Sequence, residues 1–443
     1  MEILTQAAQF ILSLSILIVL HELGHFIPAK LFKTRVEKFY LFFDPYFSLF
    51  KVKKGETEYG IGWLPLGGYV KISGMIDESM DKEQMALPPQ PWEFRSKPAW
   101  QRLIIMLGGV TVNVILGIFI YSMVLFAWGE EHLSYTNLPH GFAVDSLGKN
   151  IGIRETDSIV SIGYKPAKNI DQFQHDFLIE MTNNVVVKRE GQLITLPVSR
   201  NQLSTMLSER LSVIEPNTFF SVDSVNPEMA AAKAGLKKGD KIIAINDTPT
   251  PYYQDVKQIT RTNKKKSVKV ALVRNSKDTV TIHTIISEKG EMGFIAKLDT
   301  TGFRPDIKNY TFAQAIPAGF TKTYTTCRSY VKQMKMLFLL KNAYKEVGGF
   351  ISIGKAYTTY WDWQHFWSIT ALLSIVLAIM NILPIPALDG GHVMFLLYEV
   401  ISRRKPNEKF MEYAQYAGMF LLLSLLLFAN GNDLIRLVKG WLS

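Results

Sequence analysis

The chain has 443 residues, of which 48 % are hydrophobic and 20 % are charged, and its formal net charge is +10. This length is sufficient for about two or three domains, and the mixed composition excludes both a pure channel and a purely soluble enzyme. No Lys/Arg-rich block interleaved with aromatic residues occurs, so we exclude nucleic-acid binding and assign the excess cations to cytoplasmic loops of a membrane protein. The single cysteine, Cys327, excludes an internal disulfide and a cysteine-based metal site.

Four apolar segments are long enough to cross a bilayer, which requires about 20 residues. They cover residues 4–31, 103–128, 366–388 and 413–428. No small-residue cleavage site follows the first segment, so we expect a retained span and not a removed signal peptide. The sequence therefore predicts that the chain crosses the membrane four times.

Positive charges in the short loops predict the orientation of these spans. The first 29 residues contain no Lys or Arg, whereas residues 30–102 contain twelve and residues 403–409 contain four more. We therefore expect residues 32–102 and 400–412 to face the cytoplasm and residues 129–365 to lie outside. The first and third spans then both run from outside to inside, so their inner ends lie at the same depth.

The segment expected outside contains an internal repeat. Residues 152–162 read GIRETDSIVSI and residues 235–245 read GLKKGDKIIAI, with four identical positions at an offset of 83. Two later stretches, 185–198 and 268–284, both read as two strands joined by a polar turn. We therefore expect two copies of one β-rich unit, each of about 80–90 residues.

The second copy, with AAKAGLKKGDKIIAIN, resembles a PDZ domain of the permuted bacterial kind, and the first copy departs from that pattern at Thr156 and Gly163. PDZ domains generally bind an extended peptide at a sheet edge. The alternative is that the two copies bind nothing and only exclude bulky substrates or brace the membrane part.

The inner end of the first span carries the sequence HELGH at residues 21–25. On a helix, His21 and His25 lie one turn apart on one face, where both imidazoles can bind one zinc ion. Glu22 follows His21 directly and is placed to take a proton from the attacking water molecule. Burying three polar groups at the end of an apolar span is costly, which favours a metal site over a pair of interfacial histidines.

A candidate third ligand, Asp389, lies in NILPIPALDGGH at residues 381–392, at the inner end of the third span. Pro384 and Pro386 break the helix there, and broken backbone at membrane depth is tolerated where it lines a watery cavity. The alternative is an ordinary loop that ends the helix. His392 is a fourth ligand, a hydrogen-bond partner of Asp389 or a loop histidine, of which we favour the partner.

HELGH in the first span, LDGGH after the third and a PDZ-bearing insert between spans two and three together resemble the site-2 protease family of intramembrane zinc metalloproteases, family M50. The resemblance covers essentially the whole chain, although GGVTVN at 108–113 departs from the family's G-P-x-x-N and retains only Asn113. It implies a zinc (Zn²⁺) site with a catalytic base, and a membrane-associated β-hairpin at residues 56–74 that pairs with the substrate as a strand. The implied zinc ligands are His21, His25 and Asp389, the base is Glu22, and the substrate-binding residues are Asn381, Pro384, Pro386, Gly67 and Gly68.

The resemblance also implies the activity, an endopeptidase that cleaves single-span membrane proteins within or near the bilayer after a first protease has removed their outer domain. The implied substrates are an anti-sigma factor, in regulated intramembrane proteolysis, and remnant signal peptides. The implied location is the bacterial inner membrane, with the PDZ domains in the periplasm and the active site near the cytoplasmic side.

Two other functions compete with this one, a catalytically inactive PDZ scaffold in the membrane and a metal transporter. The intact HELGH together with Asp389 argues against the scaffold. Spans two and four are nearly free of polar residues, which argues against a transporter.

The predicted fold is a multi-span α-helical membrane protein with four transmembrane helices, a membrane-associated β-hairpin and two tandem β-rich PDZ domains inserted between spans two and three. We expect, in order, a membrane part, two PDZ domains, a linker and a second membrane part. The expected segments are 1–128, 129–214, 215–300, 301–365 and 366–443.

Overall fold

The computed structural model describes residues 2–65, 67–75, 87–209, 211–275 and 277–441. The chain forms two units, each with its own core. The first unit comprises Met1–Gly129, Asn309–Val331 and Lys345–Ser443, and the second comprises Glu130–Lys308 and Lys332–Tyr344.

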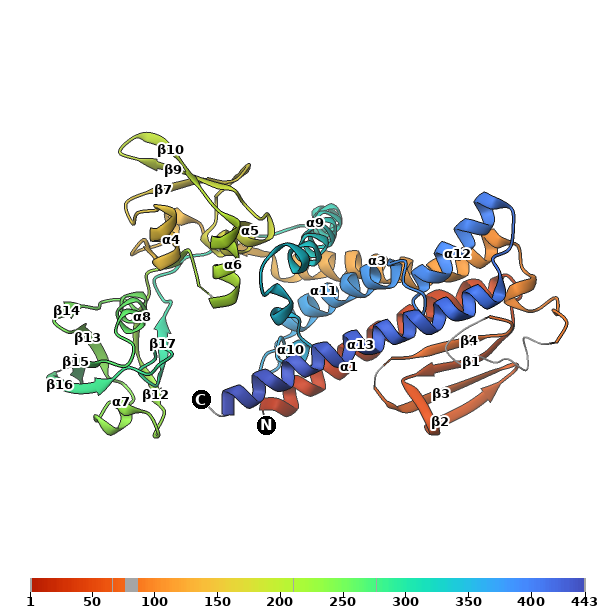
Figure 1. Cartoon of the computed structure of the whole chain (residues 1–443), viewed down its shortest axis with the longest axis horizontal. Coiled ribbons are helices and arrows are strands. Elements are labelled where there is room, and N and C mark those ends of the chain that lie inside the picture. Colours follow the sequence, from red (N-terminus) through yellow and green to blue (C-terminus); the bar gives the residue numbers. More distant parts are fainter. Residues whose placement is uncertain (1, 66, 76–86, 210, 276, 442–443) are drawn as a thin grey trace. The chain divides into compact units, whose positions relative to one another are not determined.

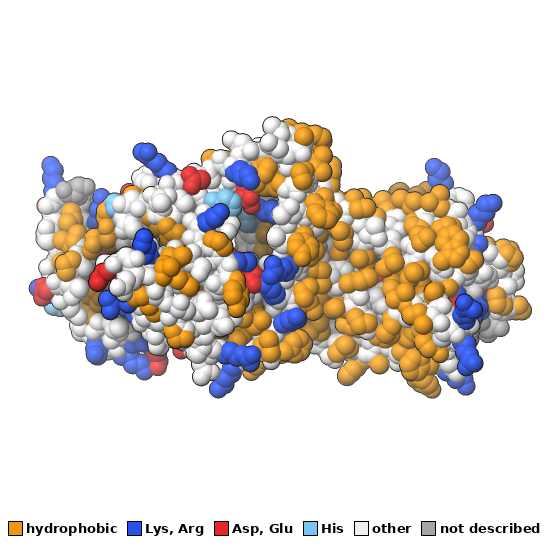
Figure 2. All heavy atoms as spheres, turned by 90° about the horizontal axis from the view of Figure 1, so that it is seen from above, with side chains coloured by type: hydrophobic (Ala, Val, Ile, Leu, Met, Phe, Trp, Pro, Cys, Tyr) orange, Lys and Arg blue, Asp and Glu red, His pale blue; other side chains and the backbone are white. Residues whose placement is uncertain are grey.

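Long apolar helices form the framework of the first unit (Figure 1). Among the described residues, four helices are long and apolar enough to cross a membrane, so the prediction of four such segments is confirmed in length and composition. They are α1 (Glu2–Leu31), α3 (Ala99–Trp128), α11 (Trp363–Ile382) and α13 (Glu408–Trp441). Hydrophobic side chains also cover much of this unit's surface on the face shown in Figure 2, as lipid-facing helices require.

The helix α11 ends at Ile382, before the predicted end of the third span at residue 388, because Pro384 restricts the residue before it and Pro386 lacks an amide donor. The chain then forms a short loop and begins α12 at Asp389. The other helices of this unit are α9 (Phe312–Leu339, whose last turns belong to the second unit), α10 (Phe350–Gly354), α12 (Asp389–Ser402) and the 3-10 helices η1 (Phe94–Ser96) and η3 (Ala343–Glu346, which begins in the second unit).

Glycines bring α1 and α3 into backbone contact. A Cβ atom on Gly24 of α1 would lie 2.5 Å from the carbonyl oxygen of Gly108 on α3. A Cβ atom on Gly109 would lie 2.3 Å from Nε2 of His25 and 2.5 Å from Cε1 of His21. Small residues at helix interfaces allow such close approach in membranes. Here they also leave the space in which the two imidazoles lie.

Residues 36–72 form a four-stranded sheet in the first unit, in the order β2-β3-β1-β4. β1 pairs with β3 in parallel and with β4 antiparallel, and β2 pairs with β3 antiparallel. β4 is therefore an edge strand. The strands are β1 (Val36–Leu41), β2 (Phe43–Lys54), β3 (Thr57–Leu64) and β4 (Tyr69–Ile72).

The prediction that residues 56–74 form a hairpin is wrong, because β1 lies between β3 and β4. The side chain of Tyr40 on β1 explains this order. Its ring covers Gly60 of β3, where a Cβ atom would lie 2.3 Å from Cζ of the ring, and stacks on Tyr69 of β4 with centroids 5.3 Å apart. The hairpin of this sheet is formed instead by β2 and β3. Residue 66, within the predicted segment, lies outside the described residues.

The second unit contains a similar succession of elements twice, except that α6 of the first copy has no counterpart among the described residues of the second (Figure 1). In the first copy a sheet of order β10-β9-β7-β8 accompanies the pair β6 and β11, and in the second copy a sheet of order β14-β13-β15-β16 accompanies the pair β12 and β17. The first copy has β6 (Phe142–Val144), α4 (Ser146–Ile151), β7 (Ser158–Ile162), β8 (Lys165–Pro166), α5 (Ile170–Ile179), β9 (Asn184–Arg189), β10 (Gln192–Pro197), α6 (Arg200–Glu209) and β11 (Ile214–Pro216). The second has β12 (Phe219–Val225), α7 (Ala230–Lys233), β13 (Lys241–Ile245), β14 (Thr248–Pro249), α8 (Tyr253–Thr262), β15 (Ser267–Arg274), β16 (Asp278–Ile285) and β17 (Phe294–Asp299). Outside the copies lie β5 (Glu130–His132), η2 (Tyr135–Asn137) and β18 (Asp306–Lys308).

A buried ion pair recurs in both copies. Nε of Arg189 lies 2.7 Å from Oδ1 of Asp157, and Nε of Arg274 lies 2.8 Å from Oδ1 of Asp240. The two aspartates are the residues that the sequence repeat aligns at an offset of 83. The repeat in the sequence therefore corresponds to a repeated contact. In the first copy it joins the residue before β7 to the end of β9, and in the second copy it joins the residue before β13 to the end of β15.

Candidate metal centre

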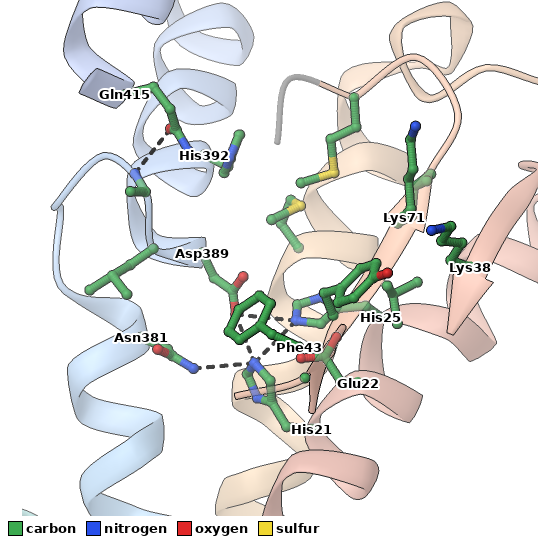
Figure 3. Close-up of a pocket in the computed structure, with 18 of the residues that line it drawn as sticks. His21, Glu22, His25, Lys38, Phe43, Lys71, Asn381, Asp389, His392 and Gln415 are labelled. Atoms are coloured by element: carbon green, nitrogen blue, oxygen red, sulfur yellow. Dashed lines mark hydrogen bonds and ion pairs between the residues drawn. The ribbon is translucent and has the colours of Figure 1, made fainter. Parts of the chain in front are cut away.

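Three side chains that could hold a metal ion meet in the first unit, two from α1 and one from the start of α12 (Figure 3). His21 and His25 are buried, with 8 % and 7 % of their surface exposed. Oδ2 of Asp389 lies 3.4 Å from Nε2 of His21 and 3.2 Å from Nε2 of His25. The ligand atoms of the three residues lie within 4.8 Å of one another, and His392 contributes none of them.

The protonation pattern of this cluster fits a metal ion. Nδ1 of His25 lies 2.8 Å from the carbonyl oxygen of Ile105, which can only accept, so Nδ1 carries a hydrogen, and in the neutral imidazole that metal binding requires Nε2 presents a lone pair. Oδ2 of Asp389 is buried without a hydrogen bond to any described residue. Two atoms with lone pairs therefore face each other, an arrangement that a cation between them stabilises. A donor set of two imidazoles and one carboxylate suits zinc with an open fourth position.

His21 is held by two amides. Nδ2 of Asn113 on α3 lies 3.0 Å from its Nδ1, and Nδ2 of Asn381 at the end of α11 lies 3.2 Å from its Nε2. Asn113 is fully buried, and its Oδ1 has no hydrogen-bond partner among the described residues. The oxygen and nitrogen of an amide are interchangeable in shape, and turning this amide lets Oδ1 accept from Nδ1–H of His21. Nε2 then presents its lone pair to the cluster, as it does in His25.

Glu22 lines a cavity of about 660 Å³ beside the cluster. Its carboxylate is close to the backbone amide of Val70 on β4. A Cβ atom on Gly68 would lie 3.5 Å from Cγ of Glu22, so the glycine before β4 lies against this side chain. All four residues of β4 line the same cavity. The edge strand, the carboxylate and the three ligands therefore surround one space.

The sequence-predicted site residues take different positions around this cavity. Asn381, Gly68 and His392 line it together with His21, Glu22, His25 and Asp389. Pro384, Pro386 and Gly67 are not among the described residues that line it. The two prolines lie in the loop that ends α11 and places Asp389 at the start of α12.

Sequence reasoning missed three further residues that line the cavity. The hydroxyl of Tyr69 donates to Oδ1 of Asp44 over 2.8 Å, and burial, reinforced by this hydrogen bond, raises the pKa of Tyr69. Gln415 of α13 lines the cavity on the side of α12. Gln415 alone had a signal, as a lone amide in the apolar segment 413–428. Tyr69 lies in the segment 56–74 that was expected to pair with the substrate, but no pattern distinguishes this residue or Asp44 individually.

Comparison with known proteins is consistent with this geometry. The family model described as Peptidase family M50 matches residues 9–425. A putative zinc metalloprotease of Treponema pallidum is 26 % identical over 439 residues, covering 95 % of this chain and 96 % of the relative. The regulator of sigma E protease of Haemophilus influenzae is 26 % identical over 99 % of this chain and 100 % of the relative. The regulator of sigma-E protease RseP of Escherichia coli is 27 % identical over 97 % and 98 %.

Proposed function

The chain belongs to peptidase family M50 and is a zinc metalloprotease of that family, and we propose that it cleaves single-span membrane proteins within or near the bilayer. One observation carries the proposal. His21, His25 and Glu22 lie on a helix that is long and apolar enough to cross a membrane, and Asp389 meets the two histidines from the start of α12. Polar chemistry is expensive at such a position and indicates that the substrate itself is in the membrane.

The proposed zinc ligands are His21, His25 and Asp389. A bound zinc ion would supply Lewis-acid chemistry, polarising the scissile carbonyl and making water more acidic. Glu22 lines the same cavity and acts as the base, taking a proton from the attacking water and passing it to the leaving amine. The carbonyl of Ile105 and the amide of Asn113 hold the two imidazoles in position.

The proposed substrate site is the outer edge of β4, the last strand of the sheet that the described residues form, together with Asn381. A helix hides its carbonyls in its own hydrogen bonds, so a transmembrane substrate must unwind before cleavage. An unwound segment can pair with an edge strand as an additional strand, and β4 has such an edge beside Glu22. Gly68 lets the chain before β4 pack against Ile18 and the backbone of Tyr40. We propose that the amide of Asn381, which contacts His21 in this structure, donates to a substrate carbonyl. We also propose that Pro384, Pro386 and Gly67 shape the segments that flank the substrate.

The names of the Haemophilus and Escherichia relatives, regulators of sigma E, support a specific pathway. We propose that this chain cleaves an anti-sigma factor after a first protease has acted, and that it clears remnant signal peptides. The proposed location is the inner membrane, with the second unit in the periplasm and the metal centre near the cytoplasmic side, as the positive loops indicate. We also propose the two repeat copies as PDZ domains at 129–214 and 215–300, with 1–128 and 366–443 as membrane parts and 301–365 as the connection.

A cavity beside the second copy supports peptide capture. It has a volume of about 1000 Å³ and is lined by α8, the end of β12, residues 289–295 and, from the first copy, Ser146, Glu209 and Leu211. Of its cationic side chains, Lys257 is paired with Glu215 and Arg261 with Asp145. Lys264 and Lys289 favour a peptide with an acidic end, although the carboxylates of Glu209 and Glu291 also line the cavity. In a binding assay with such a peptide, Lys264→Gln with Lys289→Gln should weaken binding, whereas Lys277→Gln outside the cavity should not. Equal binding by all forms would favour exclusion of bulky substrates as the sole role.

The test of the proposed function uses the full chain in detergent with a tagged single-span substrate. Glu22→Gln should lower the cleavage rate by about 10²–10⁴-fold, the usual contribution of a general base. Glu56→Gln, an exposed carboxylate in the β2–β3 turn, is the matched control and should cleave like the wild type. Cleavage by Glu22→Gln at the wild-type rate would reject the proposed active site and favour the inactive scaffold.

A further inference from the structure

The loop between α11 and α12 contains an unfavourable backbone conformation next to the metal centre. Ala387 has φ +81°, in the left-handed region that residues with a Cβ atom rarely occupy. Ala387 lies two residues before Asp389, which is the first residue of α12. The N-cap residue of α12, Leu388, makes no side-chain capping bond. The start of α12 therefore depends on what holds the loop.

Gln415 of α13 holds this residue. The backbone amide of Ala387 donates to Oε1 of Gln415 over 3.0 Å. Gln415 is only 5 % exposed, in a helix whose most apolar stretch is otherwise largely exposed. A buried amide that accepts from a strained backbone position offsets the strain, because losing the bond would leave both groups unsatisfied.

Gly418 lies one turn further along the same face of α13. A Cβ atom at this position would lie 1.6 Å from the carbonyl oxygen of Pro386. No residue other than glycine fits here without moving the loop. Gln415 and Gly418 therefore contact consecutive residues of the loop that leads to Asp389, one through a hydrogen bond and the other through backbone contact.

We infer that Gln415 and Gly418 are positioning residues for the metal ligand Asp389. They act by holding the loop, so the fourth apolar helix is part of the support of the zinc site although it supplies no ligand. This inference rests on the proposed zinc centre. A residue that merely stabilised the contact between α13 and the loop would change the unfolding temperature but leave the zinc affinity of the folded chain unchanged.

The experiment measures zinc affinity of the full chain in detergent by competition with a chromogenic chelator, together with the unfolding temperature. Gln415→Leu should weaken zinc binding on the order of tenfold, the low end for loss of an outer support of a ligand. Gln415→Glu retains an acceptor and should bind zinc nearly as the wild type does. Ser424→Ala removes an exposed hydroxyl of α13 that bonds Phe420 in the same helix, and serves as control. Equal weakening by Gln415→Leu and Gln415→Glu would overturn the inference.

The glycine offers an independent test with a matched control. Gly418→Ala should weaken zinc binding by a similar factor, whereas Gly431→Ala on the same helix, where a Cβ atom meets nothing within 4 Å, should not. Ala387→Gly should restore part of the affinity of Gln415→Leu, because glycine adopts a positive φ without strain. Unchanged zinc affinity in both Gln415→Leu and Gly418→Ala would overturn the inference. Absence of zinc from the wild type would instead reject the proposed function.

Discussion

The side-chain amide of Asn113 on α3 contacts the imidazole of His21 on α1, with 3.0 Å between Nδ2 and Nδ1. Partners of this kind set the tautomer and orientation of a metal-ligating histidine. We expect Asn113→Leu to weaken zinc binding by about 10–100-fold. Asn113→Asp retains an acceptor for Nδ1–H and should lose much less. Equilibrium competition with a chelator measures both.

The control for this prediction lies on the same helix. Ser122 of α3 bonds the carbonyl of Ile118 one turn earlier and is absent from the described lining of the metal-site cavity. Ser122→Ala should therefore bind zinc as the wild type does. If Asn113→Leu also bound zinc with wild-type affinity, the amide would have no part in orienting His21.

Removal of the third ligand should remove the metal. Asp389→Ala leaves only the two imidazoles of the proposed ligand set, so we expect the zinc content of the purified chain to fall from about one ion to near zero. Metal analysis by mass spectrometry measures the ratio. Asp247→Ala changes an exposed carboxylate of the second unit and should leave zinc content unchanged. Undiminished zinc in Asp389→Ala would remove Asp389 from the ligand set.

A single added methyl group on α3 should also disrupt the site. In Gly109→Ala the Cβ atom would lie 2.3 Å from Nε2 of His25, so the imidazole must move. We expect zinc affinity to fall by at least tenfold, as for other changes to the support of metal ligands, although alanine favours the helix. Gly117→Ala is the matched change, because its Cβ atom meets Cδ1 of Ile375, the flexible end of a side chain away from the cluster. Equal zinc affinity in both variants would show that the space at Gly109 is not needed.

The repeated ion pairs predict an acid-sensitive second unit. The hydrogen bond from Arg189 holds the pKa of Asp157 below its usual value. Burial acts to raise the pKa of Asp240, but the hydrogen bond from Arg274 outweighs it, so this pKa is also lowered. A lowered folded-state pKa means that each pair stabilises the fold above the unfolded pKa of about 3.9 and loses this contribution as pH falls through the lower folded value.

Each pair should therefore be measurable at neutral pH. Asp157→Asn or Asp240→Asn should lower the melting temperature of the second unit at pH 7, by roughly 2–4 °C for each kcal/mol of stability lost, with the difference from wild type shrinking below about pH 4. Melting of the full chain followed by circular dichroism from pH 7 to pH 3 measures this. Asp247→Asn, whose carboxylate is 80 % exposed, is the control. A difference that stayed constant down to pH 3 would contradict the linkage.

The sequence by itself determined the features that depend on local spacing. The four apolar segments, the pairing of His21 with His25 and the repeat that aligns Asp157 with Asp240 follow from bilayer thickness, the helical turn and identical letters at a fixed offset. The approach of Asp389 to the histidines can also be predicted from the sequence, because polar groups at equal depth in parallel spans can come together.

Only the tertiary structure decided the features that depend on which segments become neighbours. The order of strands in the first sheet, with β1 between β3 and β4, brings into contact residues that no local pattern relates, such as Tyr40 and Gly60. The support of Asp389 by Gln415 and Gly418 depends on where α13 meets the loop at Ala387. Such contacts depend on how side chains and backbone from distant segments pack together. The periodicity of residues along the chain does not predict them.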